Sequence, residues 1–470
     1  MVFSSYSFLL IAFPILLIVY YLIPSDARNA VLLLFSLGFY AWSGPKYLLL
    51  MLASITINYV SGLAIDKWAG AKIQNIVLAI SVILNLILLF YFKYFNFLID
   101  NINSAFKLSI TLPEVILPIG ISFYTFQGIS YVVDVKRGDA KFQKNPFKLA
   151  LFISLFPQLI AGPIVRYADV AEDIDSRSLS ASKVEDGMFR FAVGLAKKVL
   201  VANMLGEYAD YAFALEAGEL SLITAWLGAL CFTLQIYYDF SGYSDMAIGI
   251  GQMLGFCFCE NFNYPYIADS ITEFWRRWHI SLSSWFRDYV YIPLGGNRRG
   301  TAKQILNIMI VWMLTGLWHG ASWNFVLWGG YYAILLILEK FIFAKFCRVL
   351  PKALRHILTL LLVVFGWVIF QASDLAHVGL IFRTMADCRT NCSLFINQLL
   401  RFLREYGILF CAAVIGATPV VKGFAKRLFE KIKSRTARML IRTFIFVLLL
   451  FFSIMRIVVS SYNPFIYFRF

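Results

Sequence analysis

The sequence is short of charge. Of its 470 residues, 15% are Asp, Glu, Lys or Arg, whereas 60% are hydrophobic and the mean hydropathy is +0.73. A soluble domain carries about a quarter charged residues, so a single water-soluble core of this composition has too few polar groups to cover its surface. Soluble enzymes, disordered chains and disulfide scaffolds are therefore excluded, and a polytopic membrane protein remains.

Acidic residues are the scarcer of the two charge types. The chain has 42 Lys and Arg against 27 Asp and Glu, which gives a net charge of +15. The basic residues gather between apolar runs, which favours cytoplasmic loops beside anionic lipid over nucleic-acid binding. These clusters span residues 136–148, 276–303, 340–355 and 422–442. The loop from Glu207 to Glu219 contains four acidic residues and no basic one, so we expect it on the outer side.

Metal-binding and targeting patterns are also missing. The seven cysteines include no C-x-x-C pair and no zinc-ligand spacing, so no metal site is expected. Cys388 and Cys392 are either a disulfide or two thiols. The first 25 residues carry no charge, no basic n-region and no A-x-A cleavage site, which predicts a retained first span and not a signal peptide.

What the chain does have is a series of long uncharged runs. A helix needs about 20 apolar residues to cross the hydrocarbon, so several of these runs are too short for a simple crossing. They predict roughly ten or eleven crossings, some tilted, re-entrant or interfacial. After the first 25 residues, the runs span 29–45, 47–65, 73–92, 115–133, 149–165, 220–238, 305–338, 357–373 and 443–455.

The run 305–338 is the longest. As one helix it spans about 51 Å, which exceeds the roughly 30 Å hydrocarbon core, yet two full crossings need about 40 residues. Basic clusters flank both ends, so we expect a helical hairpin that turns within the membrane or at its far edge. Gly316 and Gly320 are expected to break the helix, and His319 lies at the turn as the one ionisable residue of the run.

His319 is a functional candidate because an ionisable group at membrane depth is costly. Neutral imidazole keeps one donor and one acceptor, so it suits such a site. The alternative is a structural histidine that bonds a neighbouring helix. His356 and His377 lie near span ends without companions and are interpreted as ordinary interfacial residues.

A second histidine, His279, lies in an aromatic and basic segment. Trp275, Trp278, Leu282 and Trp285 recur at helical spacing and predict one apolar helix face. Tryptophan with arginine on such a helix is typical of the headgroup interface, so an interfacial anchor is one interpretation. The other is that Arg276 and Arg277 bind a phosphate-bearing cytoplasmic donor, since guanidinium groups suit phosphate.

A third polar stretch spans residues 235–245. Asp239 and Asp245 stand six residues apart, without His or Cys at metal-ligand spacing. Ser241 lacks a G-x-S-x-G elbow. We favour a helix break whose Asp and Ser side chains cap backbone groups, and keep Asp239 and Ser241 as candidate substrate-binding residues.

Together these stretches resemble the membrane-bound O-acyltransferase family, and within it the bacterial alginate O-acetyltransferase branch. The resemblance covers nearly the whole chain and is strongest from about residue 117 to 330. The matching motifs are LPIGISFYTFQ at 117–127, AGP at 161–163, DFSGYSDMAIG at 239–249, NFNYPY at 261–266, FWRRWHISLS at 274–283, YIPLGG at 291–296, LWHG at 317–320 and SYNPFIY at 461–467.

The resemblance implies a single all-α transmembrane domain over residues 1–470, with about eleven transmembrane helices plus re-entrant and interfacial helices around a central tunnel. It implies transfer of an acyl group from a cytoplasmic thioester, with the family's near-invariant histidine at His319 and the second family position at His279. The donor is acetyl-CoA or an acyl carrier protein, and no bound cofactor is expected. Relatives work in the bacterial inner membrane with an extracytoplasmic partner acyltransferase.

Such a reaction needs a base for the hydroxyl proton and a donor for the developing oxyanion. A neutral His319 is the expected base, and His279, the Trp323 indole or Asn324 is the expected orienting or donating group. The favoured acceptor is alginate or a similar exopolysaccharide. Peptidoglycan O-acetylation, D-alanyl transfer to teichoic acid and a transporter are the alternatives, although the two halves lack the matched broken spans of an inverted-repeat transporter.

Overall fold

The computed structural model describes residues 2–42, 44–113, 115–160, 162–343, 349–387, 392–460, 462–464 and 466. Within these ranges the chain is almost entirely helical and contains no strand, as expected for an all-α membrane protein. The Cα positions group into two units, residues 1–191 with 243–260 and residues 192–242 with 261–470. Helices α9 (Ala181–Ala196) and α11 (Leu222–Leu254) pass through both units. The single domain over 1–470 remains a prediction.

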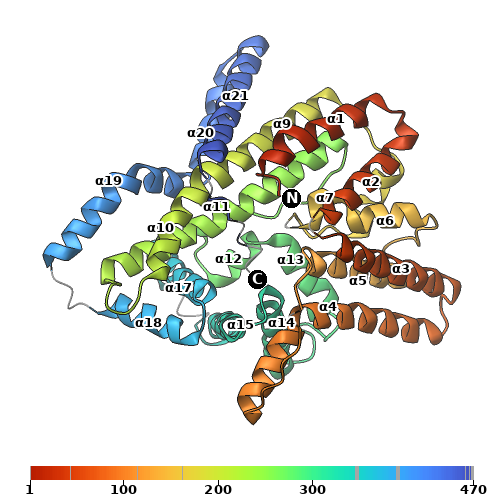
Figure 1. The fold of residues 1–470 in the computed structure, drawn as a ribbon, viewed down its shortest axis with the longest axis horizontal. Coiled ribbons are helices and arrows are strands. Elements are labelled where there is room, and N and C mark those ends of the chain that lie inside the picture. Colours follow the sequence, from red (N-terminus) through yellow and green to blue (C-terminus); the bar gives the residue numbers. More distant parts are fainter. Residues whose placement is uncertain are drawn as a thin grey trace. The chain divides into compact units, whose positions relative to one another are not determined.

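The first unit is built on α3, α4 and α5, which pack against one another (Figure 1). Asn58 of α3 and Asn85 of α4 exchange two side-chain hydrogen bonds of 3.1 Å, and both are buried. The helices of this unit are η1 (Phe8–Ala12), α1 (Phe13–Leu22), η2 (Ser25–Ala27), α2 (Arg28–Ala41), α3 (Pro45–Lys67), α4 (Ile73–Phe106), α5 (Ile121–Arg137), α6 (Pro146–Ser154), α7 (Phe156–Leu159) and α8 (Tyr167–Asp175).

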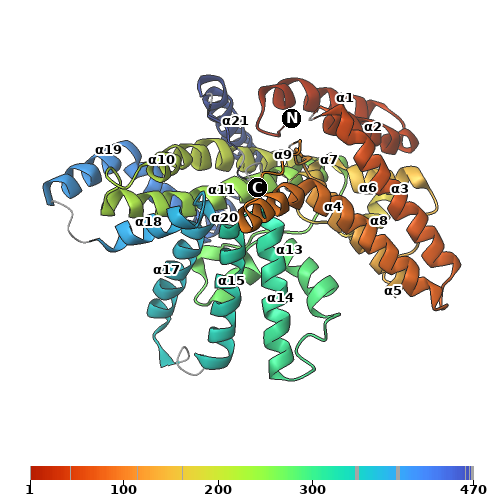
Figure 2. The same cartoon turned by 60° about the horizontal axis from the view of Figure 1, so that its bottom comes forward.

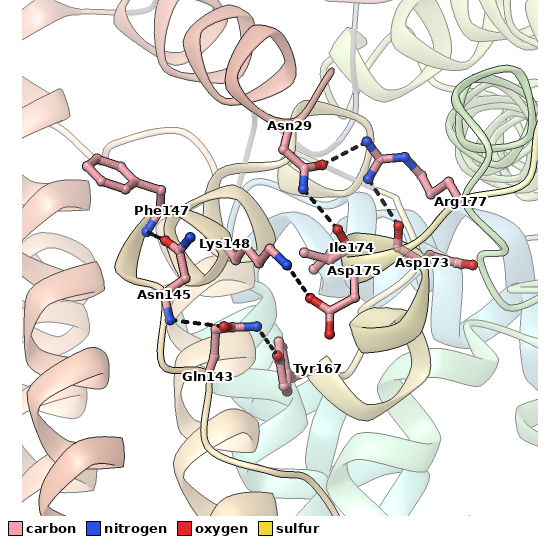
Figure 3. Close-up of polar contacts among 10 residues, drawn as sticks. All are labelled: Asn29, Gln143, Asn145, Phe147, Lys148, Tyr167, Asp173, Ile174, Asp175 and Arg177. Carbon is pink, nitrogen blue, oxygen red and sulfur yellow. Dashed lines mark hydrogen bonds and ion pairs between the residues drawn. The ribbon is translucent and has the colours of Figure 1, made fainter. Parts of the chain in front are cut away.

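Polar side chains hold the short helices of this unit in place (Figure 3). Asn145 caps α6 by accepting a 2.9 Å hydrogen bond from the Phe147 amide. Lys148 then pairs with Asp175 at the end of α8, with 2.6 Å between Nζ and Oδ1. This contact joins the basic cluster 136–148 to α8, which contains four acidic residues.

The second unit carries both candidate histidines. In it α14, α15 and α17 run side by side (Figure 2). Its helices are η3 (Lys197–Ala202), α10 (Asn203–Ala214), η4 (Pro265–Ile267), α12 (Ile271–Arg277), α13 (Ile280–Phe286), η5 (Arg287–Tyr291), α14 (Thr301–His319), α15 (Trp323–Ile337), η6 (Leu338–Ile342), α17 (Lys352–Gln371), α18 (Leu375–Ala386), α19 (Cys392–Gly416), α20 (Val420–Lys431) and α21 (Arg435–Val459).

Five helices of the described residues are long and apolar enough to cross a membrane, or six if the pair α19–α20, bent by 73°, is one span. The five are Pro45–Lys67, Ile73–Phe106, Trp323–Ile342, Lys352–Gln371 and Arg435–Val459. These helices support a multi-pass membrane protein, but about eleven crossings remains a prediction. The apolar helix near the start, Phe8–Leu22, covers only about 22 Å, so the expected first span is short of a full crossing.

The run 305–338 forms the expected hairpin. Helix α14 ends at His319, Gly320 to Ser322 turn, and α15 begins at Trp323 and packs back along α14. The expectation that two glycines break the helix is half wrong. A Cβ on Gly320 would lie 2.2 Å from the Phe325 ring, so only glycine fits at the turn, but Gly316 stays helical inside α14.

Gly316 has a different role, which it shares with Gly329 of α15. A Cβ on Gly316 would lie 2.3 Å from the Phe325 carbonyl oxygen, and one on Gly329 would lie 2.4 Å from the Trp312 carbonyl oxygen. The two backbones therefore touch, as small residues allow in membrane helix pairs. This close approach fixes where α14 ends and so where His319 stands.

We expect Gly329→Ala to push the hairpin apart and Gly330→Ala to be tolerated. The first methyl meets a backbone oxygen, whereas the second meets only the Met313 sulfur at 3.8 Å, an ordinary contact. Overpacking of this kind costs about 1–3 kcal/mol. Thermal unfolding in detergent should show a lower midpoint for Gly329→Ala alone. Equal midpoints for the two variants would contradict the close helix contact.

Candidate active site

The side chain of His319 is placed in a small apolar cavity by the hairpin turn. The cavity has a volume of about 10 Å³, which is room for about one water molecule. It is lined by Ile236, Phe240, Trp278, His319, Trp328, Trp367, Phe370 and Ile466. His319 is the one titratable side chain among these eight residues, and it is 8% exposed.

Aromatic rings surround the His319 imidazole. Its ring centroid lies 5.0 Å from that of Trp328 and 5.2 Å from that of Phe370, both nearly edge to face. A neutral ring with one nitrogen lone pair is suited to accept a proton from a bound hydroxyl.

His279 lies in a break between two short helices. Helix α12 ends at Arg277 and α13 begins at Ile280, and His279 between them has a left-handed backbone with φ of 45°. Non-glycine residues adopt this conformation at a cost, and such strain is concentrated at functional sites. Burial lowers the pKa of His279 to about 3, so its imidazole is neutral at pH 7.

The two histidines are close neighbours. The Trp318 ring contacts both, with centroid distances of 5.9 Å to His279 and 4.9 Å to His319. These two distances place the imidazole centroids at most about 11 Å apart. Phe240, which lines the cavity, also packs edge to face on His279 with centroids 4.6 Å apart. His319 therefore lines the cavity directly, and His279 packs against Phe240 of the same lining.

The predicted aromatic helix face is wrong as a continuous helix. The break at His279 separates Trp275 of α12 from Leu282 and Trp285 of α13. All of these side chains are buried inside the protein, and Trp275 packs on the Trp312 ring with centroids 4.7 Å apart. The tryptophans are core residues of the second unit, which speaks against an interfacial anchor.

The two arginines differ in their surroundings. Arg277 pairs with Glu273 one turn earlier, with 2.7 Å between Nη2 and Oε1, and its Nη1 donates to the Asn263 carbonyl oxygen at 3.1 Å. Its guanidinium is therefore already engaged within the loop. Arg276 is exposed, so it is the better placed of the two to meet a ligand.

The two candidates on α15 lie away from the cavity lining. Trp323 is 54% exposed. Asn324 is buried, but its side-chain nitrogen donates to the Ala372 carbonyl oxygen at 2.9 Å and its oxygen accepts from the Ser322 hydroxyl. Asn324 thus ties the start of α15 to the end of α17, which is a structural task. The sequence offered no means to separate these residues from Trp328, which does line the cavity.

Asp239 has a partner that the sequence analysis missed. Residues 235–245 lie inside the continuous helix α11, so the expected helix break is wrong. Asp239 forms an ion pair with Lys198 of η3, with 2.6 Å between Oδ1 and Nζ, and each side chain is 2% exposed. The available signal was a lysine within the largely apolar stretch before Asn203. Ser241 is buried and lies outside the cavity lining.

The Lys198–Asp239 pair holds the last described residues of the chain. Lys198 Nζ also donates to the Asn203 side-chain oxygen at 2.8 Å and to the Pro464 carbonyl oxygen. Asp239 Oδ2 accepts from the Ile466 amide at 3.0 Å. Since Ile466 lines the cavity, the ion pair fixes one wall of the His319 site.

The remaining histidines do have companions. His356 Nδ1 lies 2.9 Å from the Ala268 carbonyl oxygen, and His377 Nδ1 accepts from the Ser373 amide at 3.2 Å. The possible disulfide between Cys388 and Cys392 lies outside the described residues, as do Lys345 and Arg348 of the third basic cluster. No group of three His, Cys, Asp or Glu side chains suited to a metal occurs in the described part of the chain.

Comparison with known proteins identifies the family of the chain. Residues 143–382 match the model of the membrane-bound O-acyltransferase family. The chain is 46% identical to the probable alginate O-acetylase of Azotobacter vinelandii over 80% of this chain and 76% of that protein. It is 33% identical to the peptidoglycan O-acetyltransferase of Helicobacter pylori over 100% and 98% of the two chains. Identity to the teichoic acid D-alanyltransferase of Bacillus subtilis is 29% over 55% and 70%. The chain therefore belongs to the membrane-bound O-acyltransferase family.

Proposed function

We propose that this protein takes an acetyl group from a cytoplasmic thioester and passes it across the bacterial inner membrane for O-acetylation of an extracytoplasmic exopolysaccharide, alginate or a similar polymer. The observation that carries the proposal is the single titratable side chain, His319, in an apolar cavity at the turn of the α14–α15 hairpin. A thioester is already activated, so the protein has to supply a base, an oxyanion donor and a dry site.

The proposed step needs one proton acceptor. The acceptor hydroxyl approaches the thioester carbonyl carbon, and His319 takes its proton as the new C–O bond forms. The C–S bond then breaks, and the leaving thiolate recovers a proton, which regenerates neutral His319. No redox partner is needed.

Trp328 is the proposed oxyanion donor, in place of Trp323. Its side chain is fully buried and lines the cavity. Its indole nitrogen finds no hydrogen-bond partner among the described residues. A buried N–H without a partner is costly, so a developing oxyanion in the cavity is a suitable acceptor. His319 would then accept the proton of the hydroxyl, and the Trp328 indole would donate a hydrogen bond to the oxyanion that forms on the thioester carbonyl.

We expect Trp328→Phe to lower the transfer rate about 10²-fold or more, because losing one preorganised oxyanion donor has that effect. Trp323→Phe is the matched control and should leave the rate within a few-fold, since its side chain is half exposed and outside the cavity lining. Single-turnover rates with labelled acetyl-CoA measure both. A Trp328→Phe enzyme as fast as the control would remove this donor from the mechanism.

The donor side is proposed to be cytoplasmic, with Arg276 meeting the phosphates of acetyl-CoA or of a carrier-bound acyl group. Arg277 supports the same loop through the Glu273 side chain and the backbone oxygen of residue 263. An extracytoplasmic partner acyltransferase is proposed to hand the acetyl group to the polymer. The donor role rests on the exposed Arg276 and on the basic cluster around it, and the partner acyltransferase follows from the family resemblance.

The acceptor has a second candidate. Identity is higher to the alginate O-acetylase, but the peptidoglycan O-acetyltransferase matches end to end. We propose the exopolysaccharide first because 46% identity exceeds 33% by a wide margin. Peptidoglycan is the alternative that the full-length match favours.

Two measurements test the proposal. In proteoliposomes, the purified protein with its cognate extracytoplasmic acyltransferase should move label from acetyl-CoA to the polymer. In cells, deletion of the gene should remove O-acetyl esters from one surface polymer, identified by mass analysis. Loss from peptidoglycan alone would replace the exopolysaccharide by the second candidate. Unchanged acetylation of every surface polymer, with no transfer in proteoliposomes, would reject the proposal.

A further inference from the structure

Asn261 lies beside the break between α12 and α13, although it precedes His279 by 18 residues in the chain. Its side-chain oxygen lies 3.1 Å from His279 Nδ1, 2.9 Å from the Ser281 hydroxyl oxygen and 3.3 Å from the Ser281 amide nitrogen. Its backbone oxygen accepts from the Ile280 amide at 3.0 Å. Asn261 is 1% exposed, so no solvent competes for these contacts.

These contacts explain how the chain tolerates the break. A helix begins with amides that have no partner inside the helix. The residue before α13, His279, gives no side-chain cap, so the amides of Ile280 and Ser281 depend on Asn261. A segment 18 residues earlier in the chain thus supplies the cap that the sequence beside α13 lacks.

The same contacts determine which His279 nitrogen carries the proton. The Ser281 amide can only donate, so the Asn261 atom that faces it is the carboxamide oxygen. An oxygen can only accept from the imidazole, so His279 Nδ1 carries the hydrogen. In the neutral ring the lone pair then lies on Nε2.

The opposite side of the His279 ring carries the Nε2 atom. His279 is 1% exposed, and its Nε2 has no hydrogen-bond partner among the described residues. The hydrogen bonds and ring contacts that these residues make with His279 come from uncharged groups: Asn261, Ser281, Phe240 and Trp318. A buried lone pair without a donor indicates that a donor arrives with a ligand.

We propose that Asn261 is a positioning residue that holds His279 as the Nδ1–H tautomer and turns its Nε2 lone pair toward an incoming hydroxyl or thiol. This deepens the proposed function and rests on it for the identity of the reaction. His279 then accepts a hydrogen bond from the reacting group next to the His319 cavity. In other histidine sites, too, a hydrogen bond to one ring nitrogen fixes the tautomer and the orientation of the ring.

Nitrogen-15 NMR of the histidines tests the tautomer without any assay of activity. The chain contains four histidines, so His279→Gln assigns the His279 signals by difference. Wild type should show a protonated Nδ1 and an unprotonated Nε2 for His279. Asn261→Leu should give a mixture of tautomers. A protonated Nε2 in the wild type, or a spectrum unchanged by Asn261→Leu, would overturn the proposal.

Asn261→Asp keeps the test decisive if the leucine variant does not fold. The carboxylate retains an acceptor for Nδ1–H and for the Ser281 amide, and it stabilises the imidazolium. The His279 signals should therefore titrate at a higher pH than in wild type. The acid limb of the acetyl-transfer profile should shift the same way. An unmoved titration would show that residue 261 does not face the ring.

The rate of acetyl transfer provides a second test of the role of Asn261. Asn261→Leu should lower kcat at least tenfold, with Asn261→Asp recovering most of it near pH 8. Asn263→Leu is the matched control with little effect, because Asn263 is exposed and is held through its backbone. Equal losses in Asn261→Leu and Asn263→Leu would contradict positioning. If wild type transfers no acetyl group, the proposed function fails, and the NMR result still decides the role of Asn261.

Discussion

His319→Gln should abolish acetyl transfer, with a rate loss of about 10²- to 10⁴-fold, the range for removing a general base. Glutamine is close to histidine in size and keeps a hydrogen-bonding end, so it preserves packing against Trp328 and Phe370. It has no nitrogen lone pair of comparable basicity. The rate is measured as label moved from acetyl-CoA in proteoliposomes, and the midpoint of thermal unfolding in detergent is measured beside it.

His377→Gln is the control for this substitution. His377 lies near the start of α18, outside the cavity lining, and its Nδ1 accepts from the Ser373 amide. Its replacement should leave transfer within a few-fold. If His319→Gln retains the wild-type rate while remaining folded, His319 is a structural histidine. Loss of transfer with an unchanged unfolding midpoint separates a catalytic role from a packing defect, and it separates an enzyme from a transporter.

Lys198→Met should be the most destabilising single substitution proposed here, at about 3–5 kcal/mol. The Lys198 and Asp239 side chains are 2% exposed, so removal of the ammonium leaves a buried carboxylate whose one remaining partner among the described residues is the Ile466 amide. The Pro464 carbonyl oxygen loses its donor as well. We therefore expect a lower unfolding midpoint and also reduced transfer, because Ile466 no longer closes the cavity.

The double variant Lys198→Met with Asp239→Asn should recover most of the stability. Neither residue is then charged, and the asparagine oxygen still accepts from the Ile466 amide. Arg401→Met is the control, since Arg401 and Glu405 form an ion pair whose side chains are 76% and 48% exposed. Exposed pairs contribute about 0–1 kcal/mol. A Lys198→Met midpoint equal to that of Arg401→Met would contradict a structural role for the buried pair.

Hydrophobic periodicity and the distribution of charge predicted the parts of this fold that depend on residues close to one another in the sequence. The run 305–338 has no Asp, Glu, Lys or Arg and is too long for one crossing, and basic clusters flank both of its ends, so a hairpin with His319 at its turn could be predicted. The sequence predicted a helix break at both Gly316 and Gly320, and only the break at Gly320 is correct. The two glycines could not be told apart, because a glycine at a helix break and a glycine at a close helix contact look alike in the sequence.

Other expectations failed where a distant segment decides the local structure. The spacing of Trp275, Trp278 and Leu282 fits one helix, and the break at His279 becomes possible only because Asn261 caps the second half. Asp239 and Ser241 resembled capping residues at a helix end, yet Lys198 neutralises Asp239 inside a continuous helix. In each case a long-range polar contact outweighs a local preference of about 1 kcal/mol per residue.

The sequence by itself determined that the protein lies in a lipid membrane, that its fold is helical, which family it resembles, and that His319 is the leading catalytic candidate. All four follow from composition and short motifs. Only the tertiary structure decided which residues surround His319. Trp328 and Ile466 line the cavity, whereas Trp323 does not. Asn261 forms a hydrogen bond with His279, and Lys198 forms an ion pair with Asp239. These contacts join residues that are tens or hundreds of positions apart in the sequence and that come together only when the helices pack. The hydropathy pattern along the chain does not specify which polar groups will be in contact.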